Sequence, residues 1–182
     1  MKRCVPVLDP VAPEAAMIDS RLASVLKQPL YRRDRPTETH YTLEIAAYWE
    51  DDFLDAVRSG VRRKLTIGGL RSAGRNNLAV ELHPPLIPYT VAHIRGREAD
   101  IVFPAEAEVA RRLADGTLDL EPAAASWRKA PFEAKAVTLR FHESLAFRVG
   151  TLTFLIRYVH RDGRPRHVLD WVPAKFFAGY MG

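Results

Sequence analysis

The chain has 182 residues, of which 47% are hydrophobic and 27% charged, with a net charge of +5 and an isoelectric point near 9.6. This composition is ordinary for a folded globular protein and excludes an intrinsically disordered chain. The basic charge favours an anionic partner, such as a nucleic acid.

Cysteine content and hydropathy set the expected location. Cys4 is the only cysteine, so the chain cannot form an internal disulfide or a cysteine-based metal site. The opening MKRCVPVLDP contains no apolar run of the kind found in a secretory signal. No stretch approaches the roughly 18 uninterrupted apolar residues that predict a membrane span. We therefore expect a cytoplasmic protein without a membrane partner.

The first predicted elements are a helix and a strand. Residues 13–28 place apolar side chains at helical spacing, and Pro29 ends the run. A basic loop follows. Residues 40–49 then alternate between apolar and polar side chains, which predicts a strand.

Residues 50–65 are predicted to form a second helix. Three acidic residues open it, where negative charge suits the positive end of the helix dipole. Phe53, Val57 and Val61 have the spacing of a buried helical face. A glycine-rich loop and a strand at 78–82 would complete a ferredoxin-like β-α-β unit.

The best candidate for an internal boundary is the proline-rich stretch at 84–88. We expect a single domain over 1–182, in which this stretch separates a ferredoxin-like part at 1–83 from a β-rich part at 89–182.

The second half is predicted to be mostly β-strand. Short strands are expected at 89–94 and 99–104, followed by a short helix at 104–116 that starts at a proline and ends at a glycine. An irregular segment at 117–131 then leads into an antiparallel meander at 132–173. The predicted fold class is therefore α+β, with a ferredoxin-like β-α-β unit followed by an antiparallel β meander.

The main candidate binding segment is the loop RRKLTIGGLRSAGRNN at residues 62–77. Adjacent glycines let a phosphate approach the backbone amides, and the basic side chains supply charge. The loop is neither a Walker loop nor a dinucleotide fingerprint, because it lacks Gly-Lys-Ser/Thr and leads from a helix into a strand. The alternative is a glycine helix cap followed by a basic turn. The candidate nucleic-acid-binding residues here are Arg62, Arg63, Lys64, Gly68, Gly69, Arg71, Arg75 and Asn76.

Two further basic surfaces are predicted near the end of the chain. The segment RYVHRDGRPRH at 157–167 has the pattern of a basic hairpin tip, which suits either a phosphate backbone or a solvated turn. Alternate positions on the late strands predict a basic stripe on an open sheet, which suits RNA and equally suits a plain exposed face. These surfaces contribute Arg140, Arg148, Arg157, Arg161, Arg164 and Arg166.

The six histidines do not have the spacing of a metal site, so we expect neither a metal nor a cofactor. A catalytic alternative stays open, in which His142 or His160 is the general base of a ribonuclease. The sequence favours a non-catalytic protein.

The run from HYTLEIAAYW to NLAVEL, within residues 40–83, resembles the strand–helix–glycine-loop–strand segment of the RAMP proteins, the RNA-binding subunits of CRISPR systems. Asn76 stands where the family's loop pattern, I-G-G-x-R-S-x-G-x-G, has its last glycine. The resemblance implies a ferredoxin-like unit whose loop contacts guide RNA. The residues that match the pattern are Ile67, Gly68, Gly69, Arg71, Ser72 and Gly74.

Charge, the glycine loop and the resemblance together predict a basic RNA-binding protein that is a non-catalytic subunit of a ribonucleoprotein complex, with RNA and other protein subunits as partners. One alternative is a structural or interaction subunit of a phage or secretion assembly. The other is a small-molecule-binding enzyme or binder, whose cavity would be lined by the late strands with Trp127, Tyr158 and Trp171.

Overall fold

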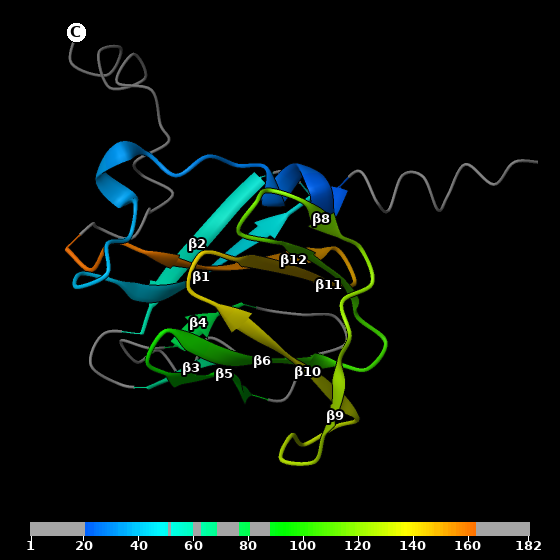
Figure 1. Ribbon diagram of the computed structural model, residues 1–182. Coiled ribbons are helices and arrows are strands. Elements are labelled where there is room, and N and C mark those ends of the chain that lie inside the picture. Colours follow the sequence, from blue (N-terminus) through cyan, green and yellow to red (C-terminus); the bar gives the residue numbers. More distant parts are fainter. Residues whose placement is uncertain (1–20, 51, 60–62, 69–76, 81–87, 163–182) are drawn as a thin grey trace, which may run out of the picture.

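The computed structural model describes residues 21–50, 52–59, 63–68, 77–80 and 88–162. Within these ranges the regular secondary structure is mostly β-strand, and the strands form two six-stranded sheets packed face to face (Figure 1). The expected α+β fold with a ferredoxin-like unit is therefore wrong, and the architecture is a β-sandwich.

The first sheet has the strand order β2-β1-β12-β11-β7-β8, and its neighbouring strands are all antiparallel. Its strands are β1 (Thr42–Trp49), β2 (Asp52–Arg58), β7 (Glu108–Arg112), β8 (Leu118–Asp119), β11 (Ser144–Val149) and β12 (Leu152–Val159).

The second sheet has the order β4-β3-β5-β6-β10-β9. The β3–β4 pair is parallel, and the other pairs are antiparallel. Its strands are β3 (Lys64–Gly68), β4 (Asn77–Ala79), β5 (Tyr89–Arg95), β6 (Glu98–Pro104), β9 (Ala125–Trp127) and β10 (Ala134–Arg140).

Each sheet combines strands from both sides of the proposed boundary at 84–88. In the first sheet β1 pairs with β12, and in the second β3 pairs with β5. The ferredoxin-like part expected at 1–83 therefore does not exist as a separate unit in the described residues, because its strands are completed by strands from the second half.

The helix expected at 50–65 is replaced by β2 and the start of β3, and a β-bulge explains the misleading pattern. Tyr48 of β1 pairs with Phe53, whereas Ala47 pairs with Asp55, so Leu54 is an extra residue in β2. A bulge of one residue reverses the faces on which the following side chains lie. Phe53 packs on the outer face of the sheet, and Leu54 packs on the core.

The same reversal continues along β2. Ala56 lies on the outer face and Val57 packs against the core, so apolar residues recur at intervals of one, three and four. That spacing is also the signature of an amphipathic helix. The sequence pattern was real, but a bulged strand produced it. Val61, the third residue of the expected helical face, lies outside the described residues.

Other expectations are confirmed or corrected strand by strand. The strands expected at 40–49, 89–94 and 99–104 are present as β1, β5 and β6, and β10, β11 and β12 form the antiparallel end of the described chain. The helix expected at 104–116 is wrong, because β7 occupies its centre. The irregular segment at 117–131 contains the short strands β8 and β9. Residues 21–26 are helical, which confirms the described part of the first helix.

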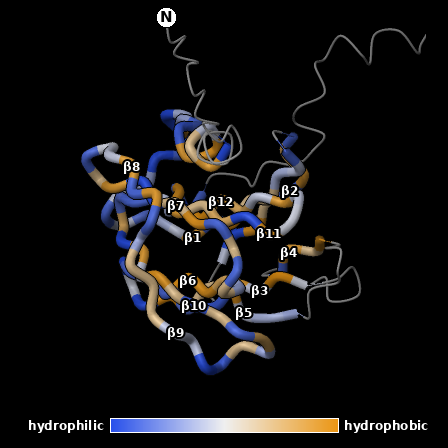
Figure 2. Tube along the Cα trace, turned by 90° about the vertical axis from the view of Figure 1, so that its right-hand side faces the viewer, coloured by the Kyte–Doolittle hydropathy of each residue, from blue (hydrophilic) through white to orange (hydrophobic). Residues whose placement is uncertain are grey.

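The main core lies between the two sheets and takes residues from both layers. Figure 2 colours each residue by its hydropathy, and hydrophobic positions occur along strands of both sheets. Ile45 and Phe154 from the first sheet, and Ile101 and Leu139 from the second, are completely buried. This burial removes apolar surface from water and is the main stabilising term of the fold.

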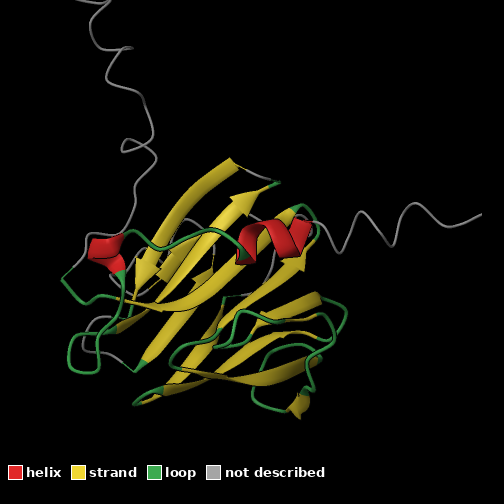
Figure 3. Cartoon of the chain, turned by 45° about the horizontal axis from the view of Figure 1, so that its top comes forward, coloured by secondary structure: helices red, strands yellow, loops and turns green. Residues whose placement is uncertain are grey.

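A second apolar cluster covers the outer face of the first sheet. The helical segment at 21–26 lies across that face (Figure 3). Its Leu22 and Leu26 pack against Ala46 and Leu155. Strands β1 and β12 are therefore buried on both faces, whereas the outer face of the second sheet carries a row of polar side chains.

Candidate nucleic-acid interface

A row of polar side chains crosses the outer face of the second sheet. The strand registers align Lys64 of β3 with His93 of β5, His93 with Asp100 of β6, and Asp100 with Thr138 of β10. We call these four residues the polar row. Because neighbouring strands lie about 5 Å apart, the polar row spans about 15 Å.

Strand alternation sets the direction of the row. Leu65 and Ile67 of β3 are buried in the core between the sheets, so Lys64 and Thr66 point to the opposite face. The Thr66 hydroxyl donates to the Asn77 side-chain oxygen over 2.7 Å, which continues the polar surface onto β4.

Asp100 is held in place by two donors. Arg95 Nη2 and Thr138 Oγ1 donate to Asp100 Oδ1 over 2.8 and 2.9 Å. The Arg95 side chain is 63% exposed, so this ion pair lies at the surface and is screened by solvent.

His93 lies at the centre of the charged groups. Burial first, and then the charge of Lys64, lower the pKa of His93 from its ordinary value of 6.5; Asp100 opposes this shift and Lys129 adds to it. The imidazole is therefore neutral at pH 7. Its centroid lies 5.2 Å from the Trp127 ring of β9, with 40° between the two planes.

The arrangement places two aromatic rings among three cations and one carboxylate. Lys64, Arg95 and Lys129 supply the positive charges, and only Asp100 among the charged groups just described is negative. Single-stranded nucleic acids bind to surfaces of this kind, because bases stack on aromatic rings while cations neutralise phosphates. The surface consists of Lys64, Thr66, His93, Arg95, Asp100, Trp127, Lys129 and Thr138, and we call it the sheet-2 face.

The predicted glycine-loop residues divide between different places. Lys64 belongs to the polar row. Arg63 precedes β3 and lines a pocket at the end of the sandwich. Gly68 ends β3 in a buried position, and its carbonyl accepts from the backbone of Val80. The residues that lie outside the described part of the chain are Arg62, Gly69, Arg71, Arg75 and Asn76 from this loop, and Arg164 and Arg166 from the predicted hairpin tip.

The predicted basic stripe on the late strands is not formed. Arg140 is exposed on β10 of the second sheet, whereas Arg148 and Arg157 belong to the first sheet. Arg157 is only 6% exposed and donates from Nη1 to the backbone carbonyl of Gln28 over 3.1 Å. The stripe required the late strands to share one open face. They are instead divided between two sheets, and Arg157 is buried where it contacts the chain at Gln28.

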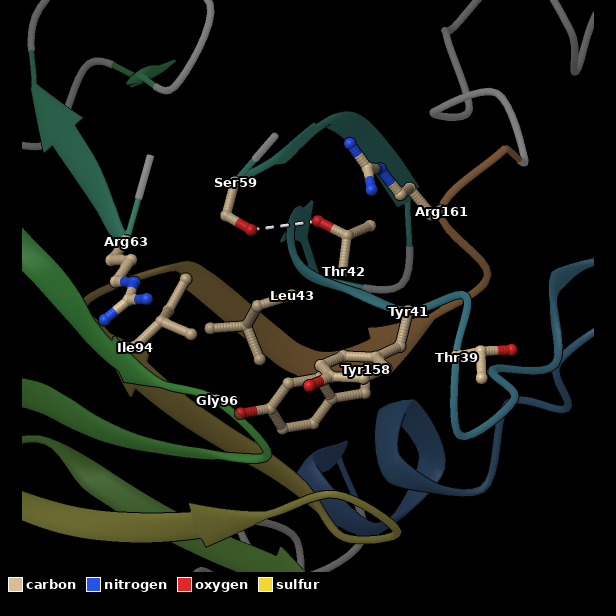
Figure 4. Close-up of a pocket in the computed structure, with 10 residues that line it drawn as sticks. All are labelled: Thr39, Tyr41, Thr42, Leu43, Ser59, Arg63, Ile94, Gly96, Tyr158 and Arg161. Carbon is tan, nitrogen blue, oxygen red and sulfur yellow. Dashed lines mark hydrogen bonds between the residues drawn. The ribbon is translucent and has the colours of Figure 1, made fainter. Parts of the chain in front are cut away.

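The pocket has a volume of about 310 Å³ and opens where the two sheets end (Figure 4). Arg161, which follows β12, and Arg63 both line it, so the structure brings together two of the predicted cations. Its lining residues are Thr39, Tyr41, Thr42, Leu43, Ser59, Arg63, Ile94, Gly96, Tyr158 and Arg161.

Sequence reasoning missed much of the sheet-2 face. His93, Arg95 and Lys129 were not singled out, although the alternation of β5 places two of them on a polar face. Trp127, considered for a small-molecule cavity, lies against His93 instead. Tyr158, considered for the same cavity, does line the pocket, and Trp171 lies outside the described residues.

The two histidines considered as general bases lie apart from the sheet-2 face. His142 is exposed and packs by its edge against Phe141. His160 stacks on His40 with ring centroids 5.8 Å apart. Among the described residues, no three His, Cys, Asp or Glu side chains are grouped so that they could hold a metal ion.

No helix in the described ranges has both the length and the apolar character needed to cross a membrane. Comparison with known protein families finds no matching family, and comparison with curated proteins finds no similar sequence. Any functional proposal therefore depends on the chemistry of these surfaces.

Proposed function

We propose that the protein is a non-catalytic, cytoplasmic RNA-binding protein, one subunit of a ribonucleoprotein complex, and that the sheet-2 face is its binding surface. The observation that carries the proposal is the His93–Trp127 ring pair, which lies close to two lysines on the polar face of a β-sheet. The net charge of +5 supports the same conclusion, because it attracts a polyanion to the whole molecule.

The chemistry of each side chain on the sheet-2 face determines its role in the proposed binding. Lys64 and Lys129 neutralise phosphates, and Trp127 gives an unpaired base an apolar ring on which to stack. Asp100 and Thr138 offer hydrogen-bonding groups to base edges or ribose hydroxyls. A neutral His93 adds a ring donor or acceptor without repelling its neighbouring lysines. A duplex cannot use the tryptophan in this way, so the favoured ligand is a single strand.

The test is fluorescence anisotropy with a labelled single-stranded uridine oligonucleotide at several salt concentrations. We expect affinity to fall steeply with salt, because bound cations on the RNA are released. In the variant Lys64→Gln/Lys129→Gln, the slope of log K against log salt should lessen by about 1.4, or about 0.7 for each phosphate of a single strand that the protein no longer neutralises. Trp127→Leu should cost roughly 1–3 kcal/mol of binding free energy.

The matched control is Lys27→Gln, since Lys27 is exposed at the end of the helical segment on the other side of the sandwich. Its loss should leave the salt slope nearly unchanged. An effect of Lys27→Gln half as large as that of the double variant, which removes two charges, would mean that net charge alone matters and would remove the sheet-2 face from the proposal. Absence of binding at low salt would leave the structural or interaction subunit as the better interpretation.

A further inference from the structure

The pocket at the end of the sandwich is lined by a tyrosine whose hydroxyl has no partner among the described residues. Tyr158 of β12 is 2% exposed, and its hydroxyl has no hydrogen-bond partner among the described residues. Burial, with smaller contributions from Tyr41 and Glu98, raises the pKa of Tyr158, so the hydroxyl remains a donor at every physiological pH. Buried polar groups are normally paired, and an unpaired one destabilises the fold.

Aromatic packing fixes the position of this hydroxyl. The Tyr158 ring lies 5.9 Å from the Tyr41 ring and 5.5 Å from the Phe141 ring, measured between centroids. Tyr41 and Phe141 contact each other edge to face at 5.0 Å. Three mutually packed rings leave Tyr158 little freedom to turn its hydroxyl elsewhere. The unpaired donor is therefore held in a fixed position on a residue that lines the pocket.

The rest of the lining is polar on one side and cationic at its flanks. Thr42 Oγ1 and Ser59 Oγ are hydrogen-bonded over 2.9 Å. In the view of Figure 4, the Arg63 and Arg161 guanidinium groups lie to either side of this pair. Both arginine side chains line the pocket, and neither has an ion-pair or hydrogen-bond partner among the described residues.

We propose that this pocket binds a small organic phosphate monoester, with its phosphate at Arg63 and Arg161 and its polar body at Tyr158, Thr42 and Ser59. Guanidinium groups match phosphate oxygens in geometry and charge, and two of them suit a dianion. The volume of about 310 Å³ is at the lower end of the range for small-molecule sites. Leu43 and Ile94 supply the apolar part of the lining that such sites share.

This site is separate from the sheet-2 face, so it does not depend on RNA binding. Glu98 is the acidic group close enough to influence Tyr158, and it is exposed, so solvent weakens its repulsion of an anion.

The experiment is calorimetric titration of the full chain with AMP and with ribose 5-phosphate, using adenosine and ribose as uncharged controls. We expect saturable binding of the two phosphates and none of the controls. Arg63→Gln and Arg161→Gln should each weaken binding about ten- to hundredfold, the effect of losing a hydrogen bond to a charged group. No saturable phosphate binding, or adenosine binding as tight as that of AMP, would overturn the proposal.

The variant Tyr158→Phe separates ligand binding from folding. It keeps the ring and removes only the unpaired hydroxyl, so AMP affinity should fall about tenfold while the melting temperature stays level or rises. The control is Tyr89→Phe, because the buried Tyr89 hydroxyl donates to the Val102 carbonyl over 3.3 Å and lies outside the pocket. That control should lower the melting temperature and leave AMP affinity unchanged. Unaltered AMP affinity in Tyr158→Phe would show that the hydroxyl does not serve a ligand.

Discussion

A buried charge cluster on the outer face of the first sheet gives the sharpest stability prediction. Glu44 of β1 is paired in register with Arg58 on one side and Arg157 on the other. Its Oε2 lies 2.8 Å from Arg58 Nε, and its Oε1 lies 3.9 Å from Arg157 Nε. The three side chains are 7–9% exposed, so solvent screens them little.

Glu44→Gln keeps the size of the side chain and removes its charge. A pair of charges about 4 Å apart interacts by about 4 kcal/mol at an effective dielectric constant of about 20. Breaking a buried ion pair at one partner typically costs about 3–5 kcal/mol, because the remaining charge stays buried. We therefore expect Glu44→Gln to lose about 3–5 kcal/mol from a total that is typically about 5–15 kcal/mol.

Urea denaturation followed by circular dichroism measures this loss as a lower midpoint at an unchanged slope. The control is Glu38→Gln, which removes the carboxylate from the Arg97–Glu38 pair, whose side chains are 49% and 74% exposed. That pair should contribute no more than about 1 kcal/mol. If Glu44→Gln lost no more than Glu38→Gln, burial would not be the factor that decides the strength of the cluster, and the reasoning would be refuted.

Two further predictions concern the helical segment and the sheet-2 face. Leu26→Ala should cost about 2–5 kcal/mol in a thermal or urea melt, because Leu26 is 2% exposed and packs from the helical segment onto the first sheet, and a loss below about 1 kcal/mol would mean that the segment does not pack there. Burial and the charges of Lys64 and Lys129 hold the pKa of His93 in the folded protein below its ordinary value of 6.5. Between 6.5 and the folded pKa, the unfolded chain therefore binds more protons than the folded protein, and lowering the pH favours unfolding. The free energy of unfolding should fall across that window more in the parent than in His93→Gln, and identical pH profiles for the two proteins would contradict this.

The strands with unbroken alternation could be predicted from the sequence, and the bulged strand could not. The alternating pattern of β1 and the apolar runs of β5 and β12 identified them directly. In β2 the extra residue Leu54 changes the period of the pattern, and only the pairing with β1 reveals the bulge. A strand of period two with one inserted residue imitates a helix over a single turn, so local reasoning chose the wrong element.

The segment around β7 shows tertiary contacts overriding local preference. Residues 104–116 contain good helix formers between a proline and a glycine, which is a typical helix pattern. In the fold, Ala110 is fully buried beneath the helical segment and pairs with Ala146 of β11. Pairing with β11 places Ala110 on the outer face and Val109 against the core. Helix propensity differs by only about 0.7 kcal/mol among ordinary residues, so such contacts outweigh it.

Of the residues that form the two candidate surfaces, mainly the basic ones could be predicted from the sequence. Lys64 and Arg63 stood out because the loop is basic, but their partners are distant in sequence. His93, Asp100 and Thr138 join Lys64 through the registers of four strands, which no local pattern encodes.

The step from Arg63 to Lys64 shows why residues adjacent in sequence should be tested separately. The carbonyl of Arg63 accepts from the amide of Ile94 over 2.8 Å, which anchors the chain as it enters β3. From that point Lys64 points to the sheet-2 face, while the Arg63 side chain lines the pocket between the sheet ends. A substitution at one position therefore changes one surface and leaves the backbone that supports the other in place. The basic loop, which the sequence predicts to be one binding element, thus supplies cations to two different surfaces. RNA affinity should therefore respond to substitution of Lys64, whereas AMP affinity should respond to substitution of Arg63.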